Sequence, residues 1–450
     1  MYKNKRFKLS TTQLILLSFL GVIILGSILL YLPISSSDGH SVSYIDALFT
    51  ATTSVCVTGL VTLPTFSAWS TFGHIVILLL IQIGGLWIIT VMSVIMILLQ
   101  RKMGIGDRIL LQDSFNLSSL SGLVRFVKKV VLGTFTVEGI GALGYMFVFV
   151  PEFGLKGIWI SVFNSVSAFC NAGMDIISDN SLCNYALNPV VNIVTSALIV
   201  LGGIGYIVWW DVLRVIKNVK RRRFFNLTLH SKIAVSATLF LIISGALMFF
   251  IFEYDNPLTI KGMRWFDKLQ ISLFQSVTTR TAGFATVPQE NLTNTSAIVS
   301  LLLMFIGGSP VGTAGGVKTV TVAVLFAAAV SAIKNRNDIN LFGRNISMQT
   351  IGKAIGVVGM SFVTMLVSTI LLSMTTDRSV IDVLYETVSA TATVGLSRSL
   401  TPTLNLWGKL IVTVTMYLGR VGPISLAIAF GLKKKNENLI KNPTEDISVG

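Results

Sequence analysis

Charged residues are scarce in this chain. Of its 450 residues, 12% are charged and 52% are hydrophobic, whereas about 25% of the residues of a soluble domain are charged. Six stretches hold no Asp, Glu, Lys or Arg: residues 9–37, 47–100, 180–210, 233–252, 291–317 and 354–376. Because about 20 apolar residues cross the hydrocarbon core of a bilayer, the sequence predicts an all-α polytopic membrane protein. These runs exclude a β-barrel, whose strands alternate apolar and polar residues.

Cysteine and histidine are equally scarce. The chain has three of each, with no C-x-x-C pair and no metal-ligand spacing, which argues against a disulfide framework or a zinc site. An intramembrane enzyme would need a nucleophile or a metal set, and these residues supply neither. Residues 9–32 are too long an apolar run for a cleavable signal and lack a small-residue cleavage site. They read as the first spanning helix.

The chain carries one pattern four times: a long apolar helix, a short amphipathic helix, a loop with one glycine, and a second long helix. The short helices and loops read YIDALFTATTSVCVTGL, WISVFNSVSAFCNAGMD, LQISLFQSVTTRTAGFA and VIDVLYETVSATATVGL. Their loop glycines are Gly59, Gly173, Gly283 and Gly395, and a helix glycine follows each one 25, 29, 24 and 24 residues later. Four matches in order indicate an internal repeat.

The repeats divide the chain into pore repeats at residues 1–100, 101–217, 218–334 and 335–432, followed by a tail at 433–450. The pattern predicts eight spanning helices, near residues 12–32, 71–99, 128–150, 189–216, 231–252, 295–331, 350–374 and 405–431. Each repeat starts and ends on the same side, so the four are parallel copies around a central pseudo-fourfold axis.

The net charge of +15 becomes informative once the charges are sorted by side. The termini and the links between repeats hold 25 Lys and Arg and 7 Asp and Glu. The segments around the short helices and glycine loops hold 8 Lys and Arg and 12 Asp and Glu. The positive-inside rule therefore places both termini and the links in the cytoplasm, with 214–223 as the strongest anchor. Nucleic-acid binding would need a basic face on a soluble domain, and no stretch here could form one.

The short segments cannot cross the bilayer twice, so they are expected to be re-entrant. Non-helical backbone at membrane depth is tolerated where it lines a watery cavity, and a ring of carbonyls can replace the hydration shell of a cation. The loop glycine provides the φ angles that turn the carbonyls inward. The carboxyl end of each short helix carries about half a negative charge, which favours a cation there. As single glycines these could be turn or packing residues; four registered copies favour a pore.

These four repeats, with TSVCVTGL, SAFCNAGM, TTRTAGFA and SATATVGL, resemble the Trk/Ktr/HKT superfamily of potassium uptake proteins over nearly the whole chain. With eight helices, the chain looks most like the bacterial Ktr-type membrane subunits of the KtrB or KtrD type. Glycine in all four loops then implies potassium selectivity. The implied filter residues are Val57, Thr58, Gly59, Asn171, Ala172, Gly173, Thr281, Ala282, Gly283, Thr393, Val394 and Gly395. The four loops differ in sequence, so a fully fourfold filter is not expected.

The resemblance also implies an assembly. It predicts a multi-pass homodimer in the bacterial plasma membrane on a cytosolic ring of RCK subunits of the KtrA or KtrC type. Those partners would bind the nucleotide. For this chain the resemblance implies K+ as the transported ion, Na+ as an activator and no covalent cofactor. The alternative is an alternating-access cation symporter, although such proteins are typically built from inverted repeats and unwound helix pairs.

Residues 307–316, GGSPVGTAGG, are predicted to break the second long helix of repeat three. Each Gly in a helix interior costs about 1 kcal/mol and Pro about 3. The resemblance implies an intramembrane gating loop, and a packing kink is the simpler alternative. The segment consists of Gly307, Gly308, Ser309, Pro310, Val311, Gly312, Thr313, Ala314, Gly315 and Gly316.

Arg420 is a charge in mid-membrane, which costs roughly 2.5 to 3.5 kcal/mol on insertion scales. The resemblance places it beneath the filter beside the gating loop, and a tether to Glu138 or to carbonyls is equally open. Of the other charges, Lys318 is expected to snorkel to the inner interface. Arg280 and Arg398 are expected at the outer mouth, bracing loops through carboxylates such as Glu386 or standing as solvated rim charges. Glu138 is expected to be a buried hydrogen-bonded carboxylate, with a proton relay as the alternative.

Overall fold

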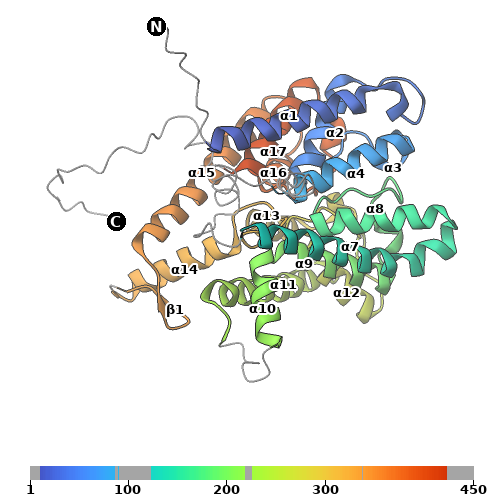
Figure 1. Ribbon diagram of the computed structural model, residues 1–450. Coiled ribbons are helices and arrows are strands. Elements are labelled where there is room, and N and C mark those ends of the chain that lie inside the picture. Colours follow the sequence, from blue (N-terminus) through green and yellow to red (C-terminus); the bar gives the residue numbers. More distant parts are fainter. Residues whose placement is uncertain (1–10, 87–89, 91–122, 218–225, 337, 423–450) are drawn as a thin grey trace, which may run out of the picture.

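The computed structural model describes residues 11–86, 90, 123–217, 226–336 and 338–422, which are mostly helical (Figure 1). Several predictions concern segments outside these residues. They are the basic start of the chain, most of the predicted helix beyond Gly85, most of the basic stretch 214–223, the end of the last helix, and the tail 433–450.

The helices form four units of one plan. The first is α1 (Thr11–Tyr31), the 3-10 turn Pro33–Ser35, α2 (Tyr44–Cys56), α3 (Thr65–Ala68) and α4 (Thr71–Gly85). The second is α7 (Leu123–Phe153), α8 (Lys156–Cys170), the turn Cys183–Tyr185, α9 (Pro189–Gly203) and α10 (Tyr206–Lys217). The third is α11 (Leu229–Glu253), α12 (Trp265–Thr278), the turn Gln289–Asn291, α13 (Asn294–Phe305) and α14 (Thr319–Ile333). The fourth is α15 (Met348–Ser373), α16 (Val380–Ala392), the turn Thr401–Thr403 and α17 (Leu406–Val421).

Local sequence starts the helix after each loop in the same way. A polar side chain just before α4, α9, α13 and α17 accepts a hydrogen bond from a backbone N–H of the first turn. Such N-caps satisfy donors that have no partner within the helix. The four N-cap residues are Ser70, Asn188, Thr293 and Asn405.

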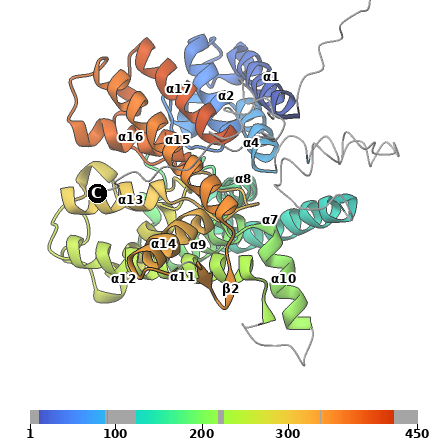
Figure 2. The same ribbon diagram turned by 90° about the vertical axis from the view of Figure 1, so that its left-hand side faces the viewer.

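Packing joins the units in cyclic order. Within units, α2, α8 and α16 each pack against the helices before and after them, and α12 packs against α11. Between units, α4 packs on α8, α9 on α12, α13 on α16, and α17 on α2. The first and last units therefore lie side by side (Figures 1 and 2), and the Tyr417 hydroxyl of α17 donates to the Leu16 carbonyl of α1 at 2.9 Å.

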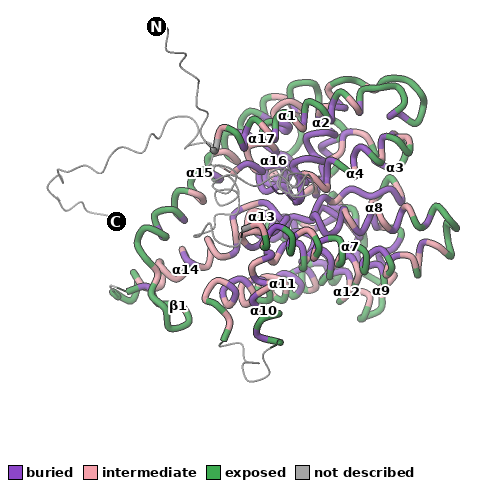
Figure 3. The backbone as a smooth tube through the Cα atoms, in the orientation of Figure 1, coloured by how far each residue is buried: buried purple, intermediate pink, exposed green. Residues whose placement is uncertain are grey.

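The centre of the molecule is buried, whereas the outer helices expose large apolar side chains. Buried backbone gathers where the short helices meet, and the outer helices are largely exposed (Figure 3). The exposed side chains of α7 and α11 include Phe147 at 80% and Phe240 at 70%. Large apolar side chains on an outer surface are the pattern expected where lipid is the solvent.

Four described helices are long and apolar enough to cross a membrane: α1 from Gln13, α7 from Val124, α11 and α15. Shorter apolar helices are α4, α13 and α14. The predicted continuous helix over 189–216 is wrong, because α9 and α10 meet at an angle of 99°. Gly205, with φ of +94°, allows that bend. The count of eight spans stays a prediction, since the described ranges stop just after α4 and α17, at residues 86 and 422.

The link before α15 contains a small hairpin of β1 (Asn340–Leu341) and β2 (Arg344–Asn345). The sequence did not predict it.

Candidate ion pathway

The four loop glycines meet in a ring. At each glycine, the space that a Cβ atom would occupy lies within 2.6 Å of a carbonyl oxygen from the next loop. That oxygen always belongs to the residue immediately before the next loop's glycine. The four contacts are Gly59 with Ala172, Gly173 with Ala282, Gly283 with Val394, and Gly395 with Thr58. The order is cyclic, so loops separated by more than 100 residues close on one another.

The backbone of these loops is strained in a repeated way. Two residues before each glycine, φ is positive: 54° at Val57, 61° at Asn171, 63° at Thr281 and 51° at Thr393. Three of these four side chains are β-branched, for which positive φ is a genuine outlier. Each such residue costs on the order of 1–3 kcal/mol, and strain of this kind gathers at functional sites. The glycines also have positive φ, from 65° to 97°.

Side-chain hydroxyls hold this conformation. The N–H of Gly59 donates to Thr53 Oγ1 at 2.9 Å, and the N–H of Gly395 donates to Ser389 Oγ at 3.0 Å. The second loop uses Ser167 Oγ, which accepts from Met174 N–H at 3.1 Å. The third loop differs, because Thr278 Oγ1 donates to the Phe284 carbonyl instead. The Ser and Thr content of the short helices therefore serves the loops.

The helix glycines spaced after the loops have a packing role. In three units a Cβ atom would overlap the carbonyl oxygen of the residue four positions before the loop glycine. The pairs are Gly84 with Val55, Gly202 with Phe169, and Gly419 with Thr391. Gly307 of the third unit meets Gly315 instead. Glycine lets each second helix approach the end of its short helix.

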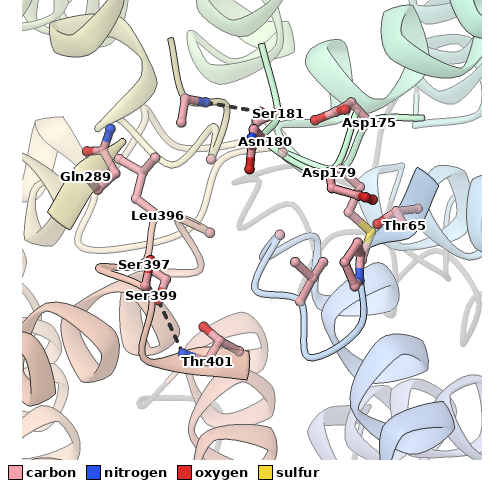
Figure 4. A pocket seen from close by; sticks show the side chains of 18 of the residues that line it. Thr65, Asp175, Asp179, Asn180, Ser181, Gln289, Leu396, Ser397, Ser399 and Thr401 are labelled. Carbon is pink, nitrogen blue, oxygen red and sulfur yellow. Dashed lines mark hydrogen bonds between the residues drawn. The ribbon is translucent and has the colours of Figure 1, made fainter. Parts of the chain in front are cut away.

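A cavity of about 410 Å³ opens on the side of the ring where the chain leaves the glycines (Figure 4). All four loop glycines line it, together with segments from every unit. Its ionisable lining consists of Asp175, Asp179, Glu290 and Cys183. Asp175 is 7% exposed, and burial raises the pKa of its carboxyl to about 6 although the Ser181 hydroxyl opposes the shift. The cavity therefore presents carboxylates to an approaching cation.

The glycine-rich segment 307–316 lies on the opposite side of the ring. It connects α13 and α14 as an irregular loop, and Ser309, Thr313 and Ala314 are at most 2% exposed. Main-chain bonds tie the loop to the α9–α10 bend. Ser309 N–H donates to the Gly203 carbonyl at 2.8 Å, and Tyr206 N–H donates to the Val311 carbonyl at 3.0 Å.

The loop also reaches the ring. Gly315 packs against Ala392 and Thr393, which lie three and two positions before Gly395. The Thr313 hydroxyl donates to the Phe169 carbonyl at 3.0 Å, near the end of α8. The segment thus runs beneath the ring between the second and fourth units.

Arg420 fastens the same loop from α17. Its side chain is buried, and one guanidinium nitrogen donates to the Thr313 carbonyl at 2.6 Å. The other donates to the Gly84 carbonyl at 2.7 Å. Arg420 therefore links three units, and of the two predicted tethers the carbonyls are the ones observed.

Comparisons with known proteins agree with this architecture. The family model described as "TrkH: Cation transport protein" matches residues 3–441. The chain belongs to the TrkH family of cation transport proteins.

Two relatives of this TrkH-family chain match it over nearly its full length. It is 37% identical to "Potassium/sodium uptake protein NtpJ" of Enterococcus hirae, covering all of this chain and 99% of that protein. It is 36% identical to "Ktr system potassium uptake protein B" of Bacillus subtilis, covering 99% of this chain and 98% of the relative. The crystal structure of the potassium transporter TrkH from Vibrio parahaemolyticus has the same fold, with a TM-score of 0.77 at 15% identity, covering 96% and 87% of the two chains.

Two sequence expectations about charges in this TrkH-family chain are wrong. Lys318 does not snorkel, because its ammonium donates to the Ala314 carbonyl at 2.6 Å, within the loop. Arg280 is buried at 6% exposure and donates to Thr238 Oγ1 of α11 at 3.3 Å. It is therefore neither a rim charge nor a brace to Glu386.

Arg398 does brace a loop, through another carboxylate. It pairs with Asp382 at 2.8 Å and donates to carbonyls of the third unit, including that of Gln289 at 3.2 Å.

Glu138 lies beside the Gln82 amide at 3.4 Å and the Cys170 thiol at 3.8 Å. It is the buried, hydrogen-bonded carboxylate that the sequence favoured.

Sequence reasoning missed two features of the site. The bend at Gly205, which receives the loop, has its signal in GGIGY, a glycine-rich stretch like the one in the third unit. The second feature is Glu386, which the sequence offered only as a partner for Arg280 or Arg398. It instead accepts hydrogen bonds from the Ser397 and Thr401 hydroxyls.

Proposed function

We propose that the chain is a potassium-selective uptake channel or transporter subunit of the bacterial plasma membrane. The observation that carries this proposal is the closed ring of four glycine loops, each facing a carbonyl of the next. Carbonyl rings replace the hydration shell of a cation. Both relatives are named for potassium uptake, one of them for sodium as well.

The proposed filter is formed by the carbonyls of the three residues ending at each loop glycine. These are the twelve positions Val57 to Gly59, Asn171 to Gly173, Thr281 to Gly283, and Thr393 to Gly395. Glycine in all four loops favours K+ over Na+. The strained backbone before each glycine supports this assignment.

The proposed gate is the loop 307–316 together with Arg420. The loop runs beneath the ring, and main-chain bonds and one guanidinium bond fasten it, while the second guanidinium bond anchors Arg420 to α4. A fixed positive charge there also opposes a cation in the pathway. The gate opens when the loop leaves this position.

The proposed architecture is four parallel pore repeats, at residues 1–100, 101–217, 218–334 and 335–432, with eight spanning helices and a tail at 433–450. Both termini lie in the cytoplasm. A homodimer on a nucleotide-binding RCK ring of the KtrA or KtrC type, with Na+ as activator, completes the assembly. The word "system" in the Bacillus subtilis relative's name fits a subunit with partners.

Rubidium flux into proteoliposomes tests the proposal. Vesicles holding the full chain are loaded with KCl and placed in a potassium-free bath, and ⁸⁶Rb+ uptake down the resulting potential is followed. We expect rubidium accumulation that is lost when the bath holds the same KCl concentration as the vesicles, because no potential then forms, and much less uptake of ²²Na+. A variant lacking Ser309 to Gly315 is measured in parallel, so that a closed gate is not mistaken for an absent pathway. No rubidium flux in either protein would overturn the proposal.

The alternative function, an alternating-access cation symporter, gives a different result in the same vesicles. Coupled transport moves K+ against its own gradient when a Na+ or H+ gradient is imposed. A pore dissipates the K+ gradient whatever the other gradients are. The closed ring of backbone contacts between the four loops favours the pore.

A further inference from the structure

Glu386 is a fully buried carboxylate behind the fourth loop. It lies on α16, nine residues before Gly395, and its exposed fraction is 0%. None of the ion pairs among the described residues includes it, and Arg398 pairs with Asp382 one turn earlier. A buried charge is costly unless it is paired or hydrogen-bonded, so its hydrogen-bond partners decide what it does.

Both carboxylate oxygens accept hydroxyl hydrogen bonds from the segment that leaves the filter. Ser397 Oγ donates to one oxygen at 2.7 Å, and Thr401 Oγ1 donates to the other at 2.5 Å. These residues follow Gly395 by two and six positions. The carboxylate therefore spans the whole exit of the fourth loop.

The direction of these bonds fits the ionised acid. Ser397 Oγ already accepts the N–H groups of Leu400 at 3.2 Å and Thr401 at 3.4 Å. Its proton is therefore directed toward Glu386. Burial raises the pKa of the Glu386 carboxyl to about 7, and the hydroxyls of Thr401 and Ser397 oppose that shift. Above pH 7 the carboxylate therefore accepts both bonds as an anion, and hydrogen bonds to ionised groups are about twice as strong as neutral ones.

The partners of Glu386 also face the ion pathway. Ser397 and Thr401 line the cavity above the ring, and their side chains lie together on the fourth unit (Figure 4). A related link exists in the third unit, where Gln275 of α12 donates to Gln289 at 2.6 Å, six positions after Gly283. That link is neutral. Of the third and fourth units, only the fourth therefore holds its loop through a carboxylate.

We infer that Glu386 is a positioning residue that sets ion selectivity by clasping the fourth loop through Ser397 and Thr401. This inference rests on the proposed function and assigns a role that the filter backbone cannot fill alone. Gly395 contacts both neighbouring loops of the ring, so its displacement changes the ring's width. The buried negative charge also favours a cation at the ring.

The test is the rubidium-to-sodium flux ratio in proteoliposomes, which is measured per folded, inserted molecule. We expect Glu386→Gln to lower the ratio about tenfold, as the loss of charge-assisted hydrogen bonds implies. Thr401→Val and Ser397→Ala should each lower it less. The double variant Glu386→Gln with Thr401→Val should be no worse than Glu386→Gln alone, because both changes remove the same contact. Glu386→Asp, which keeps the charge, should recover part of the ratio.

Thr387→Val is the matched control. Thr387 is the next residue on α16 and is equally buried, but its hydroxyl lies against Thr369 of α15 at 2.8 Å. Wild-type ratios in all the Glu386, Ser397 and Thr401 variants would overturn the clasp, as would an equal loss in Thr387→Val. If Glu386→Gln does not fold, Thr401→Val decides by the same ratio. A wild-type chain without rubidium preference overturns the proposed function, and the clasp with it.

Discussion

At the residue scale, two cationic side chains hold the loop 307–316 in place through backbone carbonyls. Arg420 joins the fourth unit to the first and third through two carbonyls, and Lys318 holds the loop from within. Neither contact involves a carboxylate, so charge pairing in the sequence could not have predicted it. Composition does identify Arg420 as exceptional, because the bilayer penalises an isolated arginine.

Replacing Arg420 by Gln should release the loop. Two charge-assisted hydrogen bonds are lost, each worth about 1.5–3 kcal/mol, so rubidium efflux from vesicles should rise by about tenfold or more. The efflux rate of Arg420→Lys should lie between those of the wild type and Arg420→Gln, since an ammonium lacks the forked geometry that reaches two carbonyls. Efflux equal to wild type in Arg420→Gln would remove the residue from the gate.

Asp175 should make uptake depend on external pH. Because burial raises its pKa to about 6, the carboxylate is charged above pH 6 and loses its charge as the pH falls through 6. A neutral group at the cavity attracts cations less, so rubidium uptake at low ion concentration should fall about twofold between pH 7 and pH 5. Asp175→Asn should show the lower rate at pH 7 and a flatter profile. An unchanged profile in that variant would contradict this role.

At the element scale, the loop 307–316 interrupts the second helix of the third unit, whereas the second helix of the second unit only bends, at Gly205. The two halves of the interrupted helix, α13 and α14, are separated by the loop, and the Gly307 N–H donates to the Val317 carbonyl at 2.9 Å where the loop begins and ends. Five glycines and a proline signal such a break in the sequence. The receiving bend at Gly205 was missed, because three glycines in an apolar run are also compatible with a packed membrane helix.

Deleting Ser309 to Gly315 should open the pathway without unfolding the chain. The ends of the loop already meet, since Val317 N–H donates to the Phe305 carbonyl at 3.2 Å, so the shortened chain can close. We expect rubidium efflux to rise by about tenfold or more, because the deletion also removes the loop carbonyl that Arg420 binds. Helicity by circular dichroism should be unchanged. Efflux at the wild-type rate in a folded deletion variant would show that the loop is not the gate.

At the scale of the whole molecule, the sequence predicts a mostly helical membrane protein of the TrkH family, which the comparisons support, and the four parallel pore repeats stay a prediction. The repeat appears as glycines at near-equal offsets, and the structure gives those offsets a reason: they bring Gly84, Gly202 and Gly419 against the short helices. Contacts between units were not readable. The Lys409–Asp46 ion pair at 2.5 Å joins residues 363 positions apart, and the Glu386 bonds depend on loop geometry. Such pairs follow from tertiary closure and leave no periodic signal.

The central claim is that the carbonyls before the four glycines form one cation site. Anomalous diffraction from crystals grown in RbCl locates the ion directly. The account predicts a rubidium peak on the axis of the ring, coordinated by the carbonyl oxygens of Thr58, Ala172, Ala282 and Val394. A ring without rubidium, with ordered peaks only at the carboxylates of the cavity, would contradict it.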